Sequence, residues 1–303
     1  MKIAFFEIKP EEKSFFEQNL KGHELYFFTE TVNEYNGKND FNIISVFINS
    51  KVNKNVLEKF PKLQYIQTRS TGVDHLDLEE IYKRGLFASN VEGYAGPAVG
   101  EFSFSLLFEA IRKTYIAIQR LKKGDLYYAD LKGIEVAGKT VGILGLGTIG
   151  KYIAKLALGF DAEVIGFNRS EKKIEGIEYT DNLDYVLKYS DFLFIALPLT
   201  KFTKNMINMQ NISKFKGKVI INPARAEIIQ KEVYETFEGI IAADVLPDWN
   251  LAKKENIIAT PHMAYYTKEA LFRIMKISLE NIRDFLSGNK PRNCLKIFYE
   301  KEK

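Results

Sequence analysis

The 303-residue sequence predicts an α/β protein built from two doubly wound parallel-sheet domains. Short apolar runs alternate with longer segments of mixed polarity along the whole chain, which is the pattern of strands alternating with helices. Several of these runs are apolar almost throughout, as expected for strands buried on both faces of a parallel sheet. The length suits two domains of ordinary size, each large enough to bury a core.

The expected elements follow from these runs and from the spacing between them. Strands are expected at residues 2–6, 24–28, 43–47, 64–67, 140–144, 163–167, 192–196, 218–221, 239–243 and 257–259. Helix-compatible spacing marks residues 151–158, 184–188 and 268–286. Proline suits a first helical turn, and the apolar spacing after Pro97 predicts one long helix that runs to about Leu121.

Composition and charge exclude several classes of function. The formal net charge is +4, and lysines are interspersed with glutamates rather than clustered as in a nucleic-acid binder. No stretch approaches the roughly 18 apolar residues of a membrane span. The single cysteine, Cys294, excludes an intrachain disulfide and fits a reducing compartment. The sequence therefore predicts a cytoplasmic protein with no membrane or nucleic-acid partner and no metal site.

One glycine-rich motif lies where a strand is expected to end and a helix to begin. It reads Gly145-Leu146-Gly147-Thr148-Ile149-Gly150. In a dinucleotide-binding turn the first glycine permits the bend, the second lets the backbone approach a pyrophosphate, and the third allows close helix–strand packing. The helix N-terminus adds free N–H groups and a positive dipole for the phosphates. The motif predicts dinucleotide binding; a glycine turn without a ligand is the alternative.

The preferred cofactor is indicated by the end of the next expected strand, 163–167. NAD enzymes usually place an Asp or Glu there for the ribose hydroxyls, whereas this sequence has Asn168-Arg169-Ser170. All three can donate hydrogen bonds to a 2′-phosphate, and Arg169 adds a planar, charged fork. We therefore predict NADP(H), with NAD possible if Arg169 only stacks on the adenine.

Further short motifs occur in a fixed order along the chain. They are Ser70-Thr71-Gly72-Val73-Asp74, Gly93-Tyr94 before Ala98-Val99-Gly100-Glu101, Leu197-Pro198-Leu199-Thr200 before Thr203, Ile221-Asn222-Pro223-Ala224-Arg225, Ala243-Asp244-Val245 and Thr260-Pro261-His262. Together with the glycine motif, they resemble the D-isomer-specific 2-hydroxyacid dehydrogenase family. That family includes D-lactate dehydrogenases, glycerate dehydrogenases and glyoxylate/hydroxypyruvate reductases.

The resemblance implies a role for each matching position. Arg225 would pair with the substrate carboxylate, and His262 would protonate the carbonyl oxygen during reduction. The backbone of Thr71, Gly72 and Val73 would donate to the same carboxylate. Apart from the resemblance, the aromatic side chains suggest an aromatic-lined substrate pocket that contains Tyr94, Trp249, Tyr265 and Tyr266. Contacts with the cofactor would come from Thr148, Ile149, Leu197, Pro198, Thr203, Pro223, Ala224 and, at the nicotinamide amide, Asp244.

One departure from the family pattern concerns the partner of His262. The family usually has a Glu five residues after the aspartate that matches Asp244, but Trp249 occupies that position here. Asp248 is the nearest carboxylate and is a candidate catalytic substitute. Otherwise Asp248 lies in solvent and His262 works unassisted.

The resemblance also implies the domain organisation. Residues 1–93 and 271–303 would form a flavodoxin-like substrate domain, and residues 94–270 a Rossmann nucleotide-binding domain, with the active site between them. A homodimer is expected. The predicted oxidoreductase transfers a hydride between NADP(H) and C2 of a small 2-oxo or 2-hydroxy acid. The alternative is a catalytically weak dinucleotide-sensing protein of the same fold. A formate or phosphite enzyme is less favoured, because formate enzymes usually have Gln at the position of Trp249.

Overall fold

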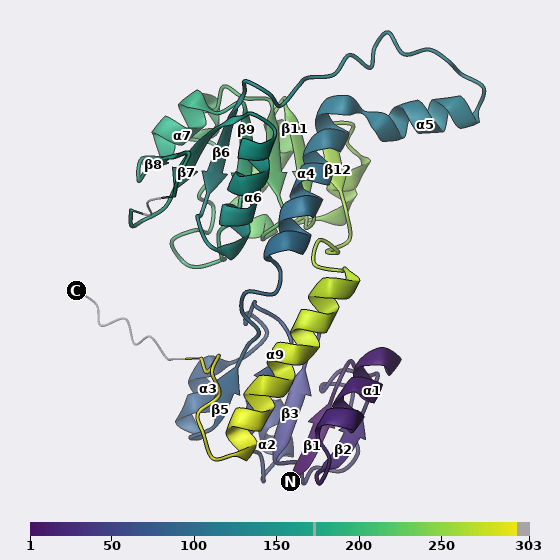
Figure 1. Ribbon diagram of the computed structural model, residues 1–303, viewed down its shortest axis with the longest axis vertical. Coiled ribbons are helices and arrows are strands. Elements are labelled where there is room, and N and C mark those ends of the chain that lie inside the picture. Colours follow the sequence, from purple (N-terminus) through teal and green to yellow (C-terminus); the bar gives the residue numbers. More distant parts are fainter. Residues whose placement is uncertain (172–173, 296–303) are drawn as a thin grey trace. The chain divides into compact units, whose positions relative to one another are not determined.

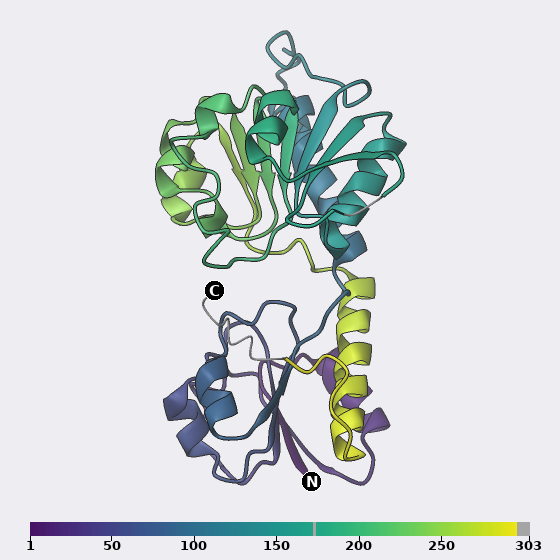
Figure 2. The same cartoon turned by 90° about the vertical axis from the view of Figure 1, so that its left-hand side faces the viewer.

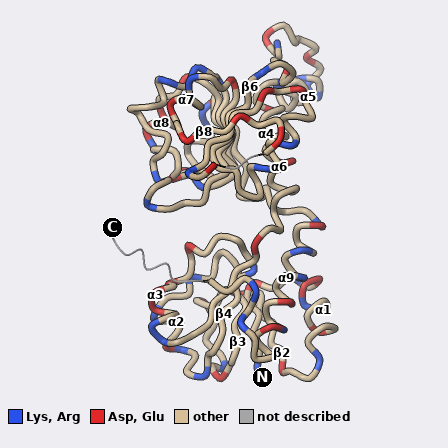
Figure 3. The backbone as a smooth tube through the Cα atoms, turned by 60° about the vertical axis from the view of Figure 1, so that its left-hand side comes forward, with Lys and Arg blue, Asp and Glu red and all other residues tan. Residues whose placement is uncertain are grey.

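The computed structural model describes residues 1–171 and 174–295. Its contacts divide the chain into two compact units (Figure 1). The first unit comprises Met1–Tyr94 together with residues 267–295, and the second comprises Ala95–Tyr266. No helix in the described residues is both long enough and apolar enough to cross a membrane. Along the tube in Figure 3, acidic and basic residues are interspersed in both units.

The first unit is built on a five-stranded parallel sheet with the order β2-β1-β3-β4-β5. The strands are β1 (Lys2–Phe5), β2 (Glu24–Phe27), β3 (Ile43–Val46), β4 (Tyr65–Thr68) and β5 (Phe87–Ser89). Helices α1 (Pro10–Asn19) and α9 (Lys268–Leu286) cover one face, and α2 (Lys54–Lys59) and α3 (Leu78–Lys83) cover the other (Figure 2). This is the flavodoxin-like order of a doubly wound sheet.

The second unit contains a seven-stranded parallel sheet with the order β12-β11-β10-β9-β6-β7-β8. Its strands are β6 (Thr140–Leu144), β7 (Glu163–Phe167), β8 (Ile177–Thr180), β9 (Phe192–Ile195), β10 (Val219–Asn222), β11 (Ile240–Ala243) and β12 (Ile257–Ala259). One core packs α4 (Gly96–Arg112) and α6 (Thr148–Gly159) against the sheet. The other core includes α7 (Leu183–Tyr189) and α8 (Lys231–Thr236). The predicted fold class, two doubly wound parallel sheets, is confirmed.

The predicted long helix from Pro97 is wrong in one respect, because it breaks into two. Lys113 adopts a left-handed conformation with φ 53° and separates α4 from α5 (Thr114–Lys122). The Glu109 carboxylate accepts hydrogen bonds from the hydroxyl of Thr114 at 2.7 Å and from the backbone N–H of Tyr115 at 3.1 Å. A side chain of the first helix thus caps the start of the second.

Candidate active site

The glycine turn joins β6 to α6 and can be formed only by glycine at two of its positions. Gly145 has φ 98°, and a Cβ atom there would lie 2.7 Å from the carbonyl oxygen of Ala196. A Cβ atom on Gly150 would lie 1.8 Å from the carbonyl oxygen of Gly145. Neither position can hold a side chain unless the turn moves.

Gly147 differs, because a Cβ atom there would meet nothing within 4 Å. It precedes the first residue of α6, and no side chain caps that end of the helix. Gly147 and Thr148 are exposed, and Ile149 is half-buried. The first turn of α6 therefore offers uncapped N–H groups beside open space. This cradle fits a pyrophosphate that approaches the backbone.

The predicted cofactor-selecting residues follow β7, directly beside the glycine turn, since the N–H of Gly145 donates to the carbonyl of Phe167 at 2.9 Å. Asn168 Nδ2 donates to the carbonyl of Ser170 at 2.8 Å and shapes the turn. Arg169 is exposed and forms no ion pair within residues 1–171 and 174–295. Its guanidinium remains available to an anionic ligand.

The loop after β9 lies against the same turn. The hypothetical Cβ atom on Gly145 would lie 2.9 Å from Leu197 Cδ2, so this side chain closes over the glycine. Thr203 is buried; its hydroxyl donates to the carbonyl of Pro198 at 2.6 Å and accepts from the N–H of Thr200 at 2.8 Å. Thr203 therefore holds the loop in shape, while the exposed Pro198 can meet a ligand.

Arg225 is presented by a turn that Asn222 organises at the end of β10. Asn222 is fully buried; its Oδ1 accepts from the N–H of Ala224 at 3.1 Å, and its Nδ2 donates to the carbonyl of Arg225 at 2.9 Å. Pro223 is buried in the same turn. Sequence reasoning gave Asn222 no role, although an amide at the end of an apolar strand before a proline is the kind of residue that fixes a turn.

Asp244 organises the loop that carries His262. Its fully buried carboxylate accepts from the Thr260 hydroxyl at 2.6 Å, from the N–H of Met263 at 2.8 Å and from the N–H of Ala264 at 2.8 Å. Its backbone carbonyl accepts from the N–H of His262 at 2.8 Å. His262 itself adopts φ 54°. The residue assigned from the sequence to the nicotinamide amide thus also holds the catalytic candidate in place.

His262 and Arg225 lie in one electrostatic neighbourhood. Burial lowers the pKa of His262 below its ordinary value of 6.5, and the positive charge of Arg225 lowers it further. Asp244 acts in the opposite direction without overcoming either cause. The ring of Tyr265 packs edge-on against the imidazole, with 6.2 Å between the ring centroids. The arrangement brings a cation suited to a carboxylate beside a titratable proton donor.

The carboxylate of Asp248, the candidate catalytic substitute, makes local contacts. It precedes the 3₁₀ helix η3 (Trp249–Lys253), and its Oδ1 accepts from the N–H and from the side-chain amide of Asn250, at 2.9 and 3.1 Å. These bonds lower the pKa of Asp248. Within the described residues Asp248 makes no hydrogen bond with His262, and the charges that shift the pKa of His262 are those of Arg225 and Asp244. The contacts give the substitute role no support.

The candidate residues thus fall into two groups. The cofactor candidates and Arg225 and His262 follow the carboxyl ends of parallel strands in the second unit, which is where ligands bind to open α/β sheets. Thr71, Gly72, Val73 and Tyr94 belong to the first unit. There the loop after β4 is tied to Val91, since the hydroxyl of Thr71 donates to its carbonyl at 2.7 Å. Tyr94 is buried, and its carbonyl accepts from Arg273 Nε at 2.8 Å.

Comparison with known proteins yields one family. The model described as "D-isomer specific 2-hydroxyacid dehydrogenase, NAD binding domain" matches residues 104–264. A glyoxylate reductase of Thermofilum pendens is 32% identical over 83% of this chain and 80% of its own length. A D-3-phosphoglycerate dehydrogenase of Methanocaldococcus jannaschii is 32% identical over 84% of this chain, which spans about half, 52%, of that relative. The crystal structure of the D-lactate dehydrogenase from Aquifex aeolicus complexed with NAD and lactic acid superposes with a TM-score of 0.87 at 28% identity, covering 95% of this chain and 96% of the other.

Proposed function

The chain belongs to the D-isomer specific 2-hydroxyacid dehydrogenase family, and from this premise we propose that it reduces a small 2-oxo acid, such as glyoxylate, with NADPH. Members of the family are NAD(P)-dependent enzymes that transfer a hydride between the nicotinamide and C2 of a 2-oxo or 2-hydroxy acid. The observation that carries the proposal is that Arg225 and His262 interact electrostatically in the same unit as a cradle that fits a dinucleotide.

The residues divide the work of the reaction. The bound cofactor supplies the hydride. Arg225 offers a planar fork to the substrate carboxylate and aligns the carbonyl. His262 donates a proton to the carbonyl oxygen in reduction and accepts it in oxidation. Thr71, Gly72, Val73 and Tyr94 are the proposed substrate-binding residues of the first unit, which makes Ala95–Tyr266 the dinucleotide domain and the first unit the substrate domain.

The preference for NADPH is proposed from the turn after β7. An exposed Arg169 without an acidic partner in the described chain suits a 2′-phosphate, and a carboxylate that would repel one is absent from the Asn168–Ser170 turn. Initial rates with about a dozen 2-oxo acids and both cofactors test the function. NADPH should give the higher kcat/KM, and Arg169→Ala should reduce it by roughly 10- to 150-fold, as for loss of a charged contact. Losses that are equal with NADPH and NADH would show that Arg169 does not read the 2′-phosphate.

The same experiment separates the enzyme from a dinucleotide-sensing protein of the same fold. A sensor would bind NADPH and turn over none of the acids. The contacts of Asp248 do not favour an assisted His262, and a protein whose histidine is a weak acid catalyst would bind the cofactor without efficient turnover. Turnover that is lost in His262→Gln, with NADPH binding retained, would support the enzyme.

We also propose a cytoplasmic homodimer. The support for a cytoplasmic location is the single cysteine, which suits a reducing compartment. The support for a dimer is the segment 113–135, here named the arm. It contains α5 and the chain after it, which extend away from the sheet of the second unit (Figure 1). α5 buries none of its side chains. A second copy of the chain is the proposed cover for this surface.

A further inference from the structure

The loop after β4 carries two backbone N–H groups, those of Gly72 and Val73, that have no hydrogen-bond acceptor within the described part of the chain. The carbonyl of the same peptide group is, in contrast, hydrogen-bonded in both cases. Asn90 Nδ2 donates to the carbonyl of Thr71 at 2.9 Å, and Ser70 Oγ donates to the carbonyl of Gly72 at 2.7 Å. Because a trans peptide places its N–H opposite its C=O, these two bonds fix the directions of both N–H groups.

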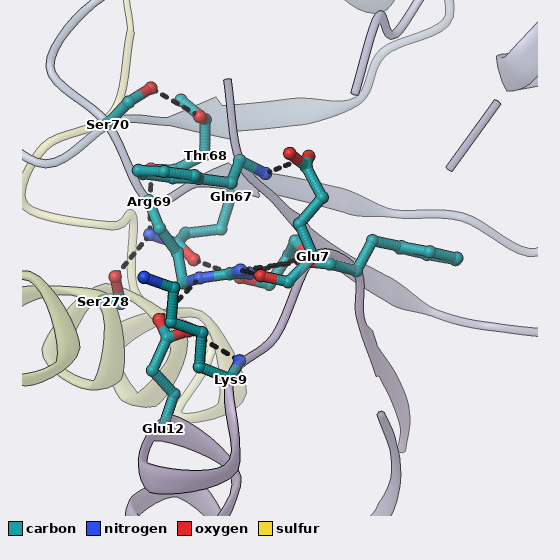
Figure 4. Close-up of polar contacts among 11 residues, drawn as sticks. Glu7, Lys9, Glu12, Gln67, Thr68, Arg69, Ser70 and Ser278 are labelled. Carbon is teal, nitrogen blue, oxygen red and sulfur yellow. Dashed lines mark hydrogen bonds and ion pairs between the residues drawn. The ribbon is translucent and has the colours of Figure 1, made fainter. Parts of the chain in front are cut away.

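The hydrogen bond from Ser70 to Gly72 is the last of three consecutive bonds that link His75, Thr68, Ser70 and Gly72. Counting hydroxyl protons shows which residue is the donor in each bond. A hydroxyl has one proton, and that of Ser70 is donated to Gly72. The 2.8 Å contact between Ser70 Oγ and Thr68 Oγ1 must then use the Thr68 proton. Thr68 Oγ1 can only accept in its 2.9 Å contact with His75, which therefore donates from Nε2. Figure 4 shows the step between Thr68 and Ser70.

Arg69 makes the start of this loop rigid (Figure 4). Its side chain is 1% exposed and donates to the carbonyls of Phe6, Glu7 and Ser45 at 2.7 to 3.1 Å. It also forms an ion pair with Glu12 at 3.3 Å. Breaking a buried ion pair by moving one partner away is strongly destabilising, so the Arg69 side chain stays in place. The residue before Ser70 is therefore a fixed support.

Asn90 is held from the opposite side by α9 and the chain after it. Asn281 Nδ2 donates to the carbonyl of Asn90 at 2.9 Å, and the N–H of Asn90 donates to the carbonyl of Asn293 at 3.3 Å. Asn90 is 4% exposed, and its Oδ1 finds no partner within the described residues. The buried Oδ1 of Asn90 thus lacks a hydrogen bond, which costs free energy of folding, whereas the Nδ2 of Asn90 binds the carbonyl of Thr71. The fold places this amide to orient one carbonyl.

We propose that Ser70 and Asn90 are positioning residues for substrate binding. By tying the carbonyls of Gly72 and Thr71 inward, they hold the N–H groups of Val73 and Gly72 ready to receive a carboxylate. The inference rests on the proposed function, because it assigns these N–H groups to the carboxylate of the 2-oxo acid. The side chains of Ser70 and Asn90 thereby determine how tightly the substrate binds without having to contact the substrate themselves.

The test compares Ser70→Ala, Asn90→Ala and Asn90→Asp with the full-length wild type. Asn90→Asp keeps the size of the side chain and removes the donor to Thr71. The matched control is Ser278→Ala, another fully buried serine of the first unit, whose hydroxyl contacts Gln67 at 2.9 Å and not the loop. Two quantities are measured: KM for the best 2-oxo acid, and, by calorimetry, the Kd of oxalate for the protein–NADPH complex. The Kd of NADPH is measured in parallel.

Each of the three loop variants should raise KM and the Kd of oxalate by about 3- to 30-fold, as for a buried carbonyl left without its donor. Their kcat should change less than KM, and their Kd for NADPH should match that of Ser278→Ala and the wild type. Values of KM and oxalate Kd within twofold of the wild type in all three loop variants would overturn the proposal while leaving the enzyme function standing. A similar rise in Ser278→Ala would also overturn it, because any loss of a buried hydroxyl would then have the same effect. A wild type without turnover would overturn the proposed function, and this inference with it.

Discussion

At the scale of single residues, the charge on His262 is set by its surroundings rather than by a dedicated carboxylate. Burial disfavours the imidazolium, and Arg225 repels it. Asp244 attracts it, but the oxygens of Asp244 already accept three hydrogen bonds from residues 260–264. The pKa of His262 is therefore lowered, whereas the hypothesis of an assisting Asp248 required it to be raised.

This arrangement predicts an acidic pH dependence for reduction. If His262 is the general acid, as proposed, it must be protonated for reduction. We therefore expect kcat/KM for the 2-oxo acid to be full below the pKa of His262 and to fall as the pH rises through it. Because that pKa lies below 6.5, the fall should occur on the acidic side of 6.5, and oxidation should rise over the same range. Asp248→Asn should leave the profile unchanged, since Asp248 caps η3. The measurement is kcat/KM against pH for both proteins. A fall that begins only above neutrality, and moves to lower pH in Asp248→Asn, would contradict it.

Arg225 allows a second prediction at the same scale. Asn222 fixes the backbone of Arg225, so Arg225→Lys should keep the turn and lose only the fork. A lysine ammonium cannot bind a carboxylate through two parallel N–H groups. We expect kcat/KM for the acid to fall by about 10- to 150-fold, as for loss of a charged hydrogen bond, with the Kd of NADPH unchanged. Near-normal kcat/KM in steady-state kinetics would mean that the carboxylate is held elsewhere.

Residue identities were more predictable from the sequence than residue partnerships. His262 and Arg225 occur in short motifs, so both could be named as candidates. The bonds of Asp244 to the His262 loop and of Asp248 to Asn250 depend on how residues 244–264 fold back on themselves. Counting positions along the sequence from Asp244 to Asp248 does not show how the chain folds or which groups these carboxylates bind. For the same reason, sequence reasoning assigned no role to Asn222 or Asn90.

At the scale of elements, the β6–α6 turn shows why the glycine motif was a strong indication. Gly145 and Gly150 are required by the chain itself, because their hypothetical Cβ atoms meet the backbone at 2.7 and 1.8 Å. Gly147 meets nothing, so its absent side chain leaves room for something other than protein. Strands with continuous apolar runs were predictable for a similar reason. The short β5 and the partly exposed edge strand β8 lack such a run and were missed.

The turn yields a prediction with a matched control on one helix. Gly150→Ala forces a Cβ atom into the carbonyl of Gly145, so the turn must open. We expect the Kd of NADPH to rise at least tenfold and Tm to fall. Gly159→Ala, at the other end of α6, meets nothing within 4 Å and should preserve binding and slightly raise Tm, since alanine is the better helix former. Fluorescence titration with NADPH and thermal unfolding measure both effects. Normal NADPH binding by Gly150→Ala would refute the assigned role of the turn.

At the scale of the whole molecule, the arm is ordered but has no core of its own. Arg120 pairs with Asp130 through two bonds of 2.6 Å, and Lys113 donates to the carbonyl of Asp130 at 3.1 Å. Eight of the eighteen large hydrophobic side chains that are exposed in the described chain nevertheless lie within residues 115–134. They are Tyr115, Ile116, Ile118, Leu121, Leu126, Tyr127, Tyr128 and Ile134. A concentration of exposed apolar side chains in one segment is typical of a contact with another protein.

We expect a second copy of the chain to cover the arm. The wild type should have twice the 34.8 kDa mass of one chain by light scattering. Leu121→Glu and Tyr128→Glu place charges on side chains that are 60% and 79% exposed, so the single chain should tolerate them. Buried in a dimer, each carboxylate would be desolvated without a partner, which is costly enough to shift the equilibrium toward the monomer.

Met209→Glu is the matched control, because Met209 is 44% exposed in the same unit but lies outside the arm. It should remain dimeric, whereas both arm variants should have the mass of one chain at micromolar concentration. Far-UV circular dichroism like that of the wild type would show that the arm variants are folded. A wild type with the mass of one chain would contradict the proposed dimer. Arm variants that are folded and still dimeric would show that the second copy does not cover the arm. Loss of the dimer in Met209→Glu as well would mean that the contact extends beyond residues 113–135, and that the arm alone does not specify the partner.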